Sequence, residues 1–169
     1  MPDTCEEDHR CQPLKATRMG PAMAELEAEY WKHKPLTAMS QAEWEALCDG
    51  CAKCCLYKLE DIDTAEVHYT NVRCRQLDDS TGRCVDYANR AALVPDCVTI
   101  TPKVLENPYW LPSTCAYRRL AEGRDLPMWH PLITGDPDSV GRAGHSMCGR
   151  TLHEDEADDL ENHLIDWVR

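Results

Sequence analysis

Four cysteines lie within eight residues in the segment CDGCAKCC, positions 48 to 55. Cys48, Cys51 and Cys54 follow a C-x-x-C-x-x-C rhythm, and Cys55 comes directly after Cys54. Thiolates at this spacing are typical ligands of zinc and of iron–sulfur clusters. A position in a hydrophobic core would not explain thiols that recur every three residues with a vicinal partner. The segment therefore predicts a metal site.

Four further cysteines follow separately along the chain, each in a turn or near the end of an expected element: Cys74, Cys84, Cys97 and Cys115. With the first four they make eight thiols. Two four-coordinate zinc sites need about eight thiolates, and an iron–sulfur cubane needs about four. The count predicts a polynuclear site or two sites, with more than one metal ion per chain.

The vicinal pair indicates how the thiols are shared. Neighbouring side chains point to opposite faces in a strand, or diverge by about 100° in a helix. Cys54 and Cys55 are therefore expected to serve two different metals, or one is expected to bridge while the other terminates. A vicinal disulfide is the competing explanation, but it needs a strained ring and an oxidising setting. The run lacks the C-x-x-x-C-P continuation of a ferredoxin motif, so the spacing does not choose between zinc and iron.

Three cysteines fall outside this pattern. Cys148 is expected to be a small core residue. Within the pattern, Cys115 fits a core position about as well as a ligand position. Cys5 and Cys11, which flank His9 in CEEDHRC, would make a weak additional site, but a disordered tail explains them better.

Of the seven histidines, His68 and His130 are the candidate ligands. A single histidine of this kind is more often a surface or core residue, and we expect that role for both. The HEDE run at 153–156 is most simply a solvated helix start.

The overall composition excludes several classes of protein. A formal net charge of -12 on 169 residues argues against a nucleic-acid partner, because neutralising phosphates requires Lys and Arg. No stretch approaches the roughly 18 uninterrupted apolar residues of a membrane span, and the N-terminal segment lacks the apolar region of a secretory signal. We therefore expect a cytoplasmic protein with reduced thiols, and the 11 cysteines, an odd number, cannot all pair with one another.

The elements that must position the cysteines are expected to be short. A capping box of Ser40 and Glu43 predicts a helix over 40–50 that leads directly into the cysteine cluster. Alternation of apolar and polar residues predicts two strands within 55–74, around the turn DIDT. The other expectations are a helix over 22–31, a turn at 78–84, a short helix from Thr101, a helix over 113–123 capped by Ser113, an irregular stretch over 125–144, and an amphipathic helix over 154–168.

These elements predict an α+β fold, with short helices and a small antiparallel sheet in an irregular domain that metal stabilises. Residues 1–21 are polar and without periodicity, so we expect a disordered tail there, followed by a cysteine-cluster domain over 22–169. A start of translation at Met19 or Met23 would remove most of that tail.

At these residues the sequence resembles the CxxCxxCC zinc- or iron-chelating cysteine-cluster family, and its YcgN-like bacterial group in particular. The resemblance runs from about Ser40 to Trp167 and includes AEWEALCDGCAKCCLYKLED, YTNVRCRQLD, VPDCV, WLPSTCAYRRLAEGRDLP and WHPLITGDP. It implies that the eight cysteines from Cys48 to Cys115 are the metal ligands. The family often shows C-x-x-Y-x-x-R-P-x-x-C; Cys84, Tyr87 and Arg90 fit it, but Ala follows Arg90 and Cys97 comes late.

Three functions follow from the cysteines. The first is a metal-binding protein without a reaction of its own, which holds zinc or iron. The second is an iron–sulfur or multi-iron redox protein that acts with a protein partner, in line with related cysteine patterns in flagellin lysine methylase proteins. The third, a thiol oxidoreductase using Cys51 and Cys54, requires a thioredoxin-like βαβ pattern that the sequence lacks. No other catalytic motif is present, so an enzymatic activity is left open.

Overall fold

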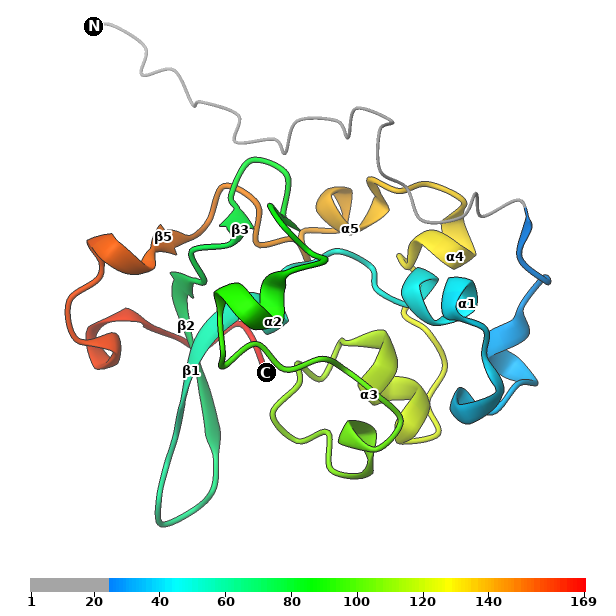
Figure 1. Ribbon diagram of the computed structural model, residues 1–169, viewed down its shortest axis with the longest axis horizontal. Coiled ribbons are helices and arrows are strands. Elements are labelled where there is room, and N and C mark those ends of the chain that lie inside the picture. Colours follow the sequence, from blue (N-terminus) through cyan, green and yellow to red (C-terminus); the bar gives the residue numbers. More distant parts are fainter. Residues whose placement is uncertain (1–24) are drawn as a thin grey trace, which may run out of the picture.

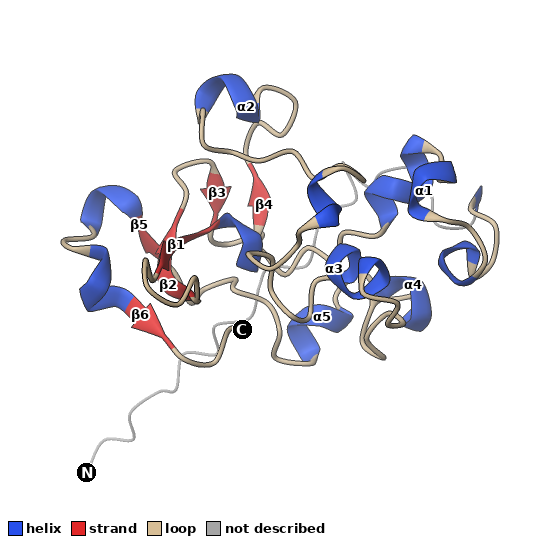
Figure 2. Ribbon diagram, turned by 90° about the horizontal axis from the view of Figure 1, so that it is seen from below, coloured by secondary structure: helices blue, strands red, loops and turns tan. Residues whose placement is uncertain are grey.

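The computed structural model describes residues 25–169 and has an α+β fold, as the sequence predicts. The strands gather on one side of the molecule, and the helices α1 (Gln41–Ala46), α3 (Ala116–Ala121) and α4 (Pro131–Thr134) lie on the other (Figures 1 and 2). The cysteine-rich segment crosses from α1 on the helical side to β1 (Leu56–Glu60) on the sheet side (Figure 1). The segment 48–55 thus lies where the two sides meet.

The main sheet is built around β2 (Val67–Arg73), which pairs antiparallel with β1 in the hairpin that the sequence predicts. Its other partners are β5 (Leu152–His153), which is parallel to it, and β6 (Leu164–Ile165), which is antiparallel. An irregularity between Leu56 and Lys58 shifts the β1 register directly after the cysteine cluster. A separate hairpin joins β3 (Leu77–Asp78) to β4 (Arg83–Cys84).

The helices are short. Beside α1, α3 and α4, the α-helices are α2 (Arg90–Leu93) and α5 (Ser139–Arg142). The 3-10 helices of the described residues are Tyr30–Lys32, Leu36–Ala38, Lys53–Cys55, Val104–Glu106, Glu154–Glu156 and Leu160–His163. The predicted capping box of α1 is present, since the Ser40 hydroxyl accepts from the Glu43 N–H and the Glu43 carboxylate accepts from the Ser40 N–H. This cap fixes the start of the helix that leads into the cluster.

Two separate hydrophobic cores support the two sides. The helical core is built on side chains that are almost fully buried, among them Tyr30, Leu47 and Leu111. The sheet core contains Leu56, Tyr69, Leu77, Met147 and Val168.

Two predicted helices are not formed. Over 22–31, the described part contains only the 3-10 turn at Tyr30–Lys32, because Glu29 adopts a left-handed conformation and both Tyr30 and Trp31 are buried. The segment 154–168 is not one amphipathic helix either: Leu164–Ile165 form the strand β6, which pairs with β2, and Val168 enters the sheet core. Pairing satisfies the backbone groups of β2, and in this segment it prevails over helical periodicity.

Three other boundaries differ from the sequence expectations. The N-cap of α3 is Cys115 and not Ser113, so the helix begins later than predicted. The short helix expected from Thr101 is a 3-10 turn at Val104–Glu106. The stretch over 125–144 contains α4 and α5, whose single turns are too short for a periodic pattern to indicate them.

The structure reports on the membrane expectation only for residues 25–169, where no helix is long and apolar enough to cross a bilayer. The expected tail over 1–21, with Cys5, His9 and Cys11, lies outside the described residues.

Candidate metal centre

The segment that carries the cluster winds through two backbone conformations that glycine favours. Gly50 has a φ of 74°, and a Cβ atom there would lie 2.6 Å from the Arg83 guanidinium carbon. Ala52 has a φ of 64° and begins the 3-10 turn that carries Cys54 and Cys55. The buried Asp49 accepts the N–H of Cys51 at 3.0 Å, which closes the loop between them. The chain can therefore turn sharply and present its thiols on more than one side.

Four of the eight predicted ligands line one small pocket. We call this group, Cys48, Cys51, Cys54 and Cys115, the first thiol set. The pocket has a volume of about 330 Å³, part of it open to solvent, and its other walls come from Leu47, Asp49, Ala52, Ile100, Pro112, Ala116 and Tyr117. Cys51 is buried, whereas Cys48 lies exposed at the rim. Cys115, for which the sequence predicts a core and a ligand position equally, lines this pocket and also packs against the helical core.

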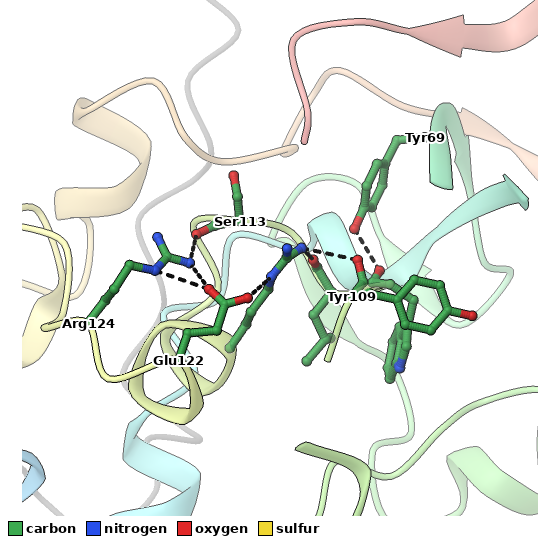
Figure 3. Close-up of polar contacts among 8 residues, drawn as sticks. Tyr69, Tyr109, Ser113, Glu122 and Arg124 are labelled. Atoms are coloured by element: carbon green, nitrogen blue, oxygen red, sulfur yellow. Dashed lines mark hydrogen bonds and ion pairs between the residues drawn. The ribbon is translucent and has the colours of Figure 1, made fainter. Parts of the chain in front are cut away.

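Cys115 reaches this pocket because the loop before α3 is held by hydrogen bonds (Figure 3). The Tyr69 hydroxyl donates to the carbonyl of Trp110 at 2.7 Å. Arg118 donates to the carbonyls of Tyr109 and Leu111, and Arg124 donates to the carbonyl of Ser113. Glu122 pairs with both arginines and keeps them in place. The sheet and α3 together fix the path of the chain that delivers Cys115.

The other four thiols form a looser group, which we call the second thiol set: Cys55, Cys74, Cys84 and Cys97. Cys74 donates its N–H to the Cys55 carbonyl at 3.0 Å, so these two residues are adjacent in the β1–β2 hairpin. The charges of Cys74 and Cys97 both raise the pKa of Cys84, after the larger effect of burial. Each member therefore lies near another member of the set.

The vicinal pair divides between the two sets and the two cores. Cys54 and Cys115 pack against the helical core, whereas Cys55 packs against the sheet core. The two adjacent thiols share a side-chain hydrogen bond, which lowers the pKa of Cys54 and raises that of Cys55. Cys55 also lies close enough to Cys48 and Cys74 for their charges to raise its pKa. The two neighbouring thiols thus pack on different sides of the molecule, and the expectation that they serve different ions, or that one of them bridges, stays a prediction.

Backbone amides point at the sulfur atoms of both sets. The donor lies two residues after its cysteine in four cases: Gly50 to Cys48, Lys53 to Cys51, Gln76 to Cys74 at 3.4 Å, and Asp86 to Cys84. In the fifth case, Arg118 donates to Cys115 from the first turn of α3. Hydrogen bonds to sulfur stabilise the thiolate relative to the thiol. The local backbone is thus arranged for anionic sulfur.

In the absence of a metal ion, burial opposes this stabilisation of the thiolates by raising the pKa of the thiols. It raises the pKa of Cys115 to about 12, and it raises the pKa of Cys51 well above its ordinary value. The charge of Cys54 raises both further, because these thiols share one pocket. At neutral pH such thiols are protonated, so a metal ion would have to displace their protons on binding.

The eight cysteine thiols are suitable ligands for zinc or iron. All eight cysteines are free thiols, so the vicinal disulfide considered for Cys54 and Cys55 is not formed. Within residues 25–169, no three Cys, His, Asp or Glu side chains are arranged to hold one metal ion. Metal binding would therefore require the thiols to rotate from their present hydrogen bonds onto the ion.

The remaining sequence expectations concern residues away from the pocket. His130 is fully buried, with Nε2 3.0 Å from the Leu47 carbonyl, and its Nδ1 accepts from the Leu132 N–H, so it is a core residue as expected. His68 is partly buried on β2. Cys148 is buried, with its sulfur 3.0 Å from the carbonyl oxygen of Ser80. His153 caps the 3-10 turn Glu154–Glu156, which is the helix start that the HEDE run predicts.

Three charged residues of the centre were missed in the sequence. Asp49 lines the pocket, Lys53 is 4% exposed, and Lys58 is partly buried beneath the vicinal pair. The Asp-Gly pair at 49–50 is a turn signal that marks Asp49 as a loop-closing residue. No sequence signal marks Lys53 and Lys58, because a lysine in such a segment is ordinarily expected to be exposed to solvent.

Comparison with known proteins was consistent with this site. The CxxCxxCC family, described as "Putative zinc- or iron-chelating domain", matches residues 47–116, which contain all eight cysteines. A UPF0260 protein of Parvibaculum lavamentivorans is 58% identical over 147 residues, which cover 86% of this chain and 96% of that protein. A UPF0260 protein of Rhizorhabdus wittichii is 60% identical over 137 residues, covering 81% and 94%. No solved structure matches the chain.

Proposed function

This chain belongs to the UPF0260 protein family, and from that premise we propose that it binds zinc or iron through its eight cysteine thiolates. The thiolates form two groups of four, the first and second thiol sets, which meet at Cys54 and Cys55. More than one metal ion is bound per chain. No reaction is part of the proposal.

The observation that carries the proposal is the pocket of the first thiol set. Four free thiols from two distant segments line it, and three of them receive hydrogen bonds from backbone amides: Cys48, Cys51 and Cys115. Thiolates are the ligands that zinc and iron–sulfur centres share, and about four of them complete a tetrahedral site. A hydrophobic core alone gives no reason to bring four thiols together.

The second thiol set supports the proposal in a different way. None of the residues 83–104 is buried, yet this segment carries Cys84 and Cys97. A segment without buried apolar residues has little to hold it against the conformational entropy of the chain. Coordination by its cysteines would fix it, because metal binding then contributes to folding.

A thiol oxidoreductase is less well supported. In that class, C-x-x-C opens a helix within a βαβ unit. Here Cys51 and Cys54 precede the antiparallel hairpin β1–β2, and the residues between them form a turn. Free thiols in this number also suit a reducing compartment, and we propose the cytoplasm.

Metal analysis and the visible spectrum of protein purified without oxygen test the proposal. We expect about two metal ions per chain for two tetrathiolate sites. A colourless protein identifies zinc, and a brown protein with charge-transfer bands identifies an iron–sulfur centre. Protein that retains no zinc or iron, and takes up neither when its thiols are reduced, would contradict the proposal.

Matched variants test the division into two sets. Cys54→Ser and Cys55→Ser should each lower the bound metal, because a hydroxyl is a poor substitute for a soft thiolate. Ala91→Ser, at an exposed position between Cys84 and Cys97, is the control and should retain all of it. A single metal ion per chain that Cys55→Ser retains in full would leave Cys55 as a core residue and remove the second set.

A further inference from the structure

Two lysines flank the vicinal pair and are withdrawn from solvent. Lys53 directly precedes Cys54 and is only 4% exposed. Lys58 follows Cys55 by three residues on β1 and is partly buried. A buried ammonium group loses its hydration, which costs several kcal/mol unless a negative charge lies nearby.

The partners of these lysines within the described chain are neutral. The Lys53 ammonium donates to the Thr114 hydroxyl at 3.2 Å. The Lys58 ammonium donates to the carbonyls of Cys54 and Leu56, both at 2.8 Å, and lies over the rings of Tyr69 and Trp110. Neither lysine forms an ion pair with a carboxylate of residues 25–169, in contrast to Lys32 and Lys34, which pair with Glu29 and Glu27 at the surface.

The thiols of Cys54 and Cys55, once ionised, bring negative charge to the Lys58 ammonium. The charges of Cys54 and Cys55 act on its ammonium and oppose the effect of burial. Its contacts hold the ammonium beside the backbone of Cys54, where the two thiol sets meet. The Lys53 ammonium lies against the hydroxyl of Thr114, the residue directly before Cys115.

A tetrathiolate centre needs such cations. Four thiolates around one divalent ion leave two negative charges uncompensated. Inside a protein these charges are poorly screened, so a cation held beside them strengthens binding.

We propose that the ammonium groups of Lys53 and Lys58 compensate the negative charge of the thiolates when these bind a metal ion. This inference rests on the proposed function, since it concerns the same thiols. It assigns the two lysines to metal affinity and not to the packing of the cores.

Zinc affinity tests this inference through competition with a chromophoric chelator on the reduced full chain. Lys58→Met keeps the length and apolar volume of the side chain and removes the charge, and Lys58→Arg keeps the charge. We expect Lys58→Met to weaken zinc binding by about tenfold or more, the usual cost of losing an outer partner of a metal site. Lys58→Arg should restore most of the affinity, and Lys103→Met, at an exposed position, should leave it unchanged.

Two outcomes would overturn the inference. One is a Lys58→Met protein that binds zinc as tightly as the wild type. The other is a Lys58→Arg protein that loses as much affinity as Lys58→Met, because the loss would then come from packing and not from charge. If Lys58→Met does not fold, Lys53→Met and Lys53→Arg provide the same comparison. Wild-type protein that binds no metal would refute the proposed function itself, whereas unchanged affinity in the variants refutes only the role of the lysines.

Discussion

The two thiol sets lie side by side but are supported in different ways. The first set lines a pocket against the helical core, whose Tyr30, Leu47 and Leu111 are inaccessible to solvent. In the second set, Cys84 and Cys97 belong to the segment 83–104, in which no residue is buried. Hydrophobic packing therefore positions the first set before any ligand binds. Cys84 and Cys97 depend mainly on local turns, such as the β3–β4 hairpin and the single turn of α2.

This difference indicates which part of the chain would depend on a metal ion for its ordered conformation. Apolar burial stabilises the helical side whether or not its thiols are ligated. The segment 83–104 gains little from burial, so a coordinated ion would provide most of its order. The sharpest tests therefore compare the two segments within one molecule.

Metal removal should have the largest effect. A strong chelator with a reductant should lower the free energy of unfolding by an amount on the order of 10 kcal/mol, the scale of structural zinc binding. Amide hydrogen exchange followed by mass spectrometry should then accelerate most over 83–104 and less over α1 and α3. The physical reason is that only the helical segments retain a packed core without the ion.

The same experiment can contradict the comparison. Equal acceleration in both segments would show that the helical core is no more independent of metal than the second thiol set. An unchanged melting temperature and circular dichroism after complete metal removal would show that the fold does not depend on metal at all.

Truncation of one leucine in each region should give the next largest effect. Leu111 is fully buried in the helical core, and Leu111→Ala should destabilise the protein by about 2–5 kcal/mol. Leu93, in α2, is 42% exposed, and Leu93→Ala should cost less than about 0.5 kcal/mol. Urea unfolding of the metal-loaded proteins measures both values. Comparable losses would mean that the segment 83–104 has a packed core of its own.

The sequence predicted the features that depend on local rules. The capping box of Ser40 and Glu43 gave the start of α1, and the alternation around DIDT gave the β1–β2 hairpin. The prediction that Cys54 and Cys55 serve different ions rests on a local rule as well, because adjacent side chains diverge in any regular backbone.

Features that depend on distant segments could not be predicted. The segment 154–168 has helical periodicity, but the exposed edge of β2 draws Leu164–Ile165 into a strand, and no local pattern signals that pairing. The burial of Lys53 and Lys58 depends on Thr114, Tyr69 and Trp110, which approach from far along the chain. The grouping of Cys115 with the first set depends on the path of the loop before α3, which is held by hydrogen bonds from Tyr69, Arg118 and Arg124.

The smallest expected effect concerns pH and the helix that leads into the first set. The Lys34 ammonium, together with the N–H of Ser40, lowers the pKa of the Glu43 carboxyl below its ordinary value of 4.5. A carboxyl with a lowered pKa in the folded state contributes stability that is present above pH 4.5 and is lost as the pH falls through the lowered pKa. Thiolate ligands also take up protons in acid, so the wild-type pH profile alone cannot isolate Glu43.

A comparison with Glu43→Gln removes that ambiguity, because both proteins carry the same thiols. The difference in free energy of unfolding between wild type and Glu43→Gln should be constant above pH 4.5 and should shrink below it. Zinc affinity at pH 7 should change little in the variant, since the helical core still positions the first thiol set. If Glu43→Gln instead lost zinc affinity along with stability, the first set would depend on the cap of α1, and the contrast between the two sets would be smaller than the packing indicates.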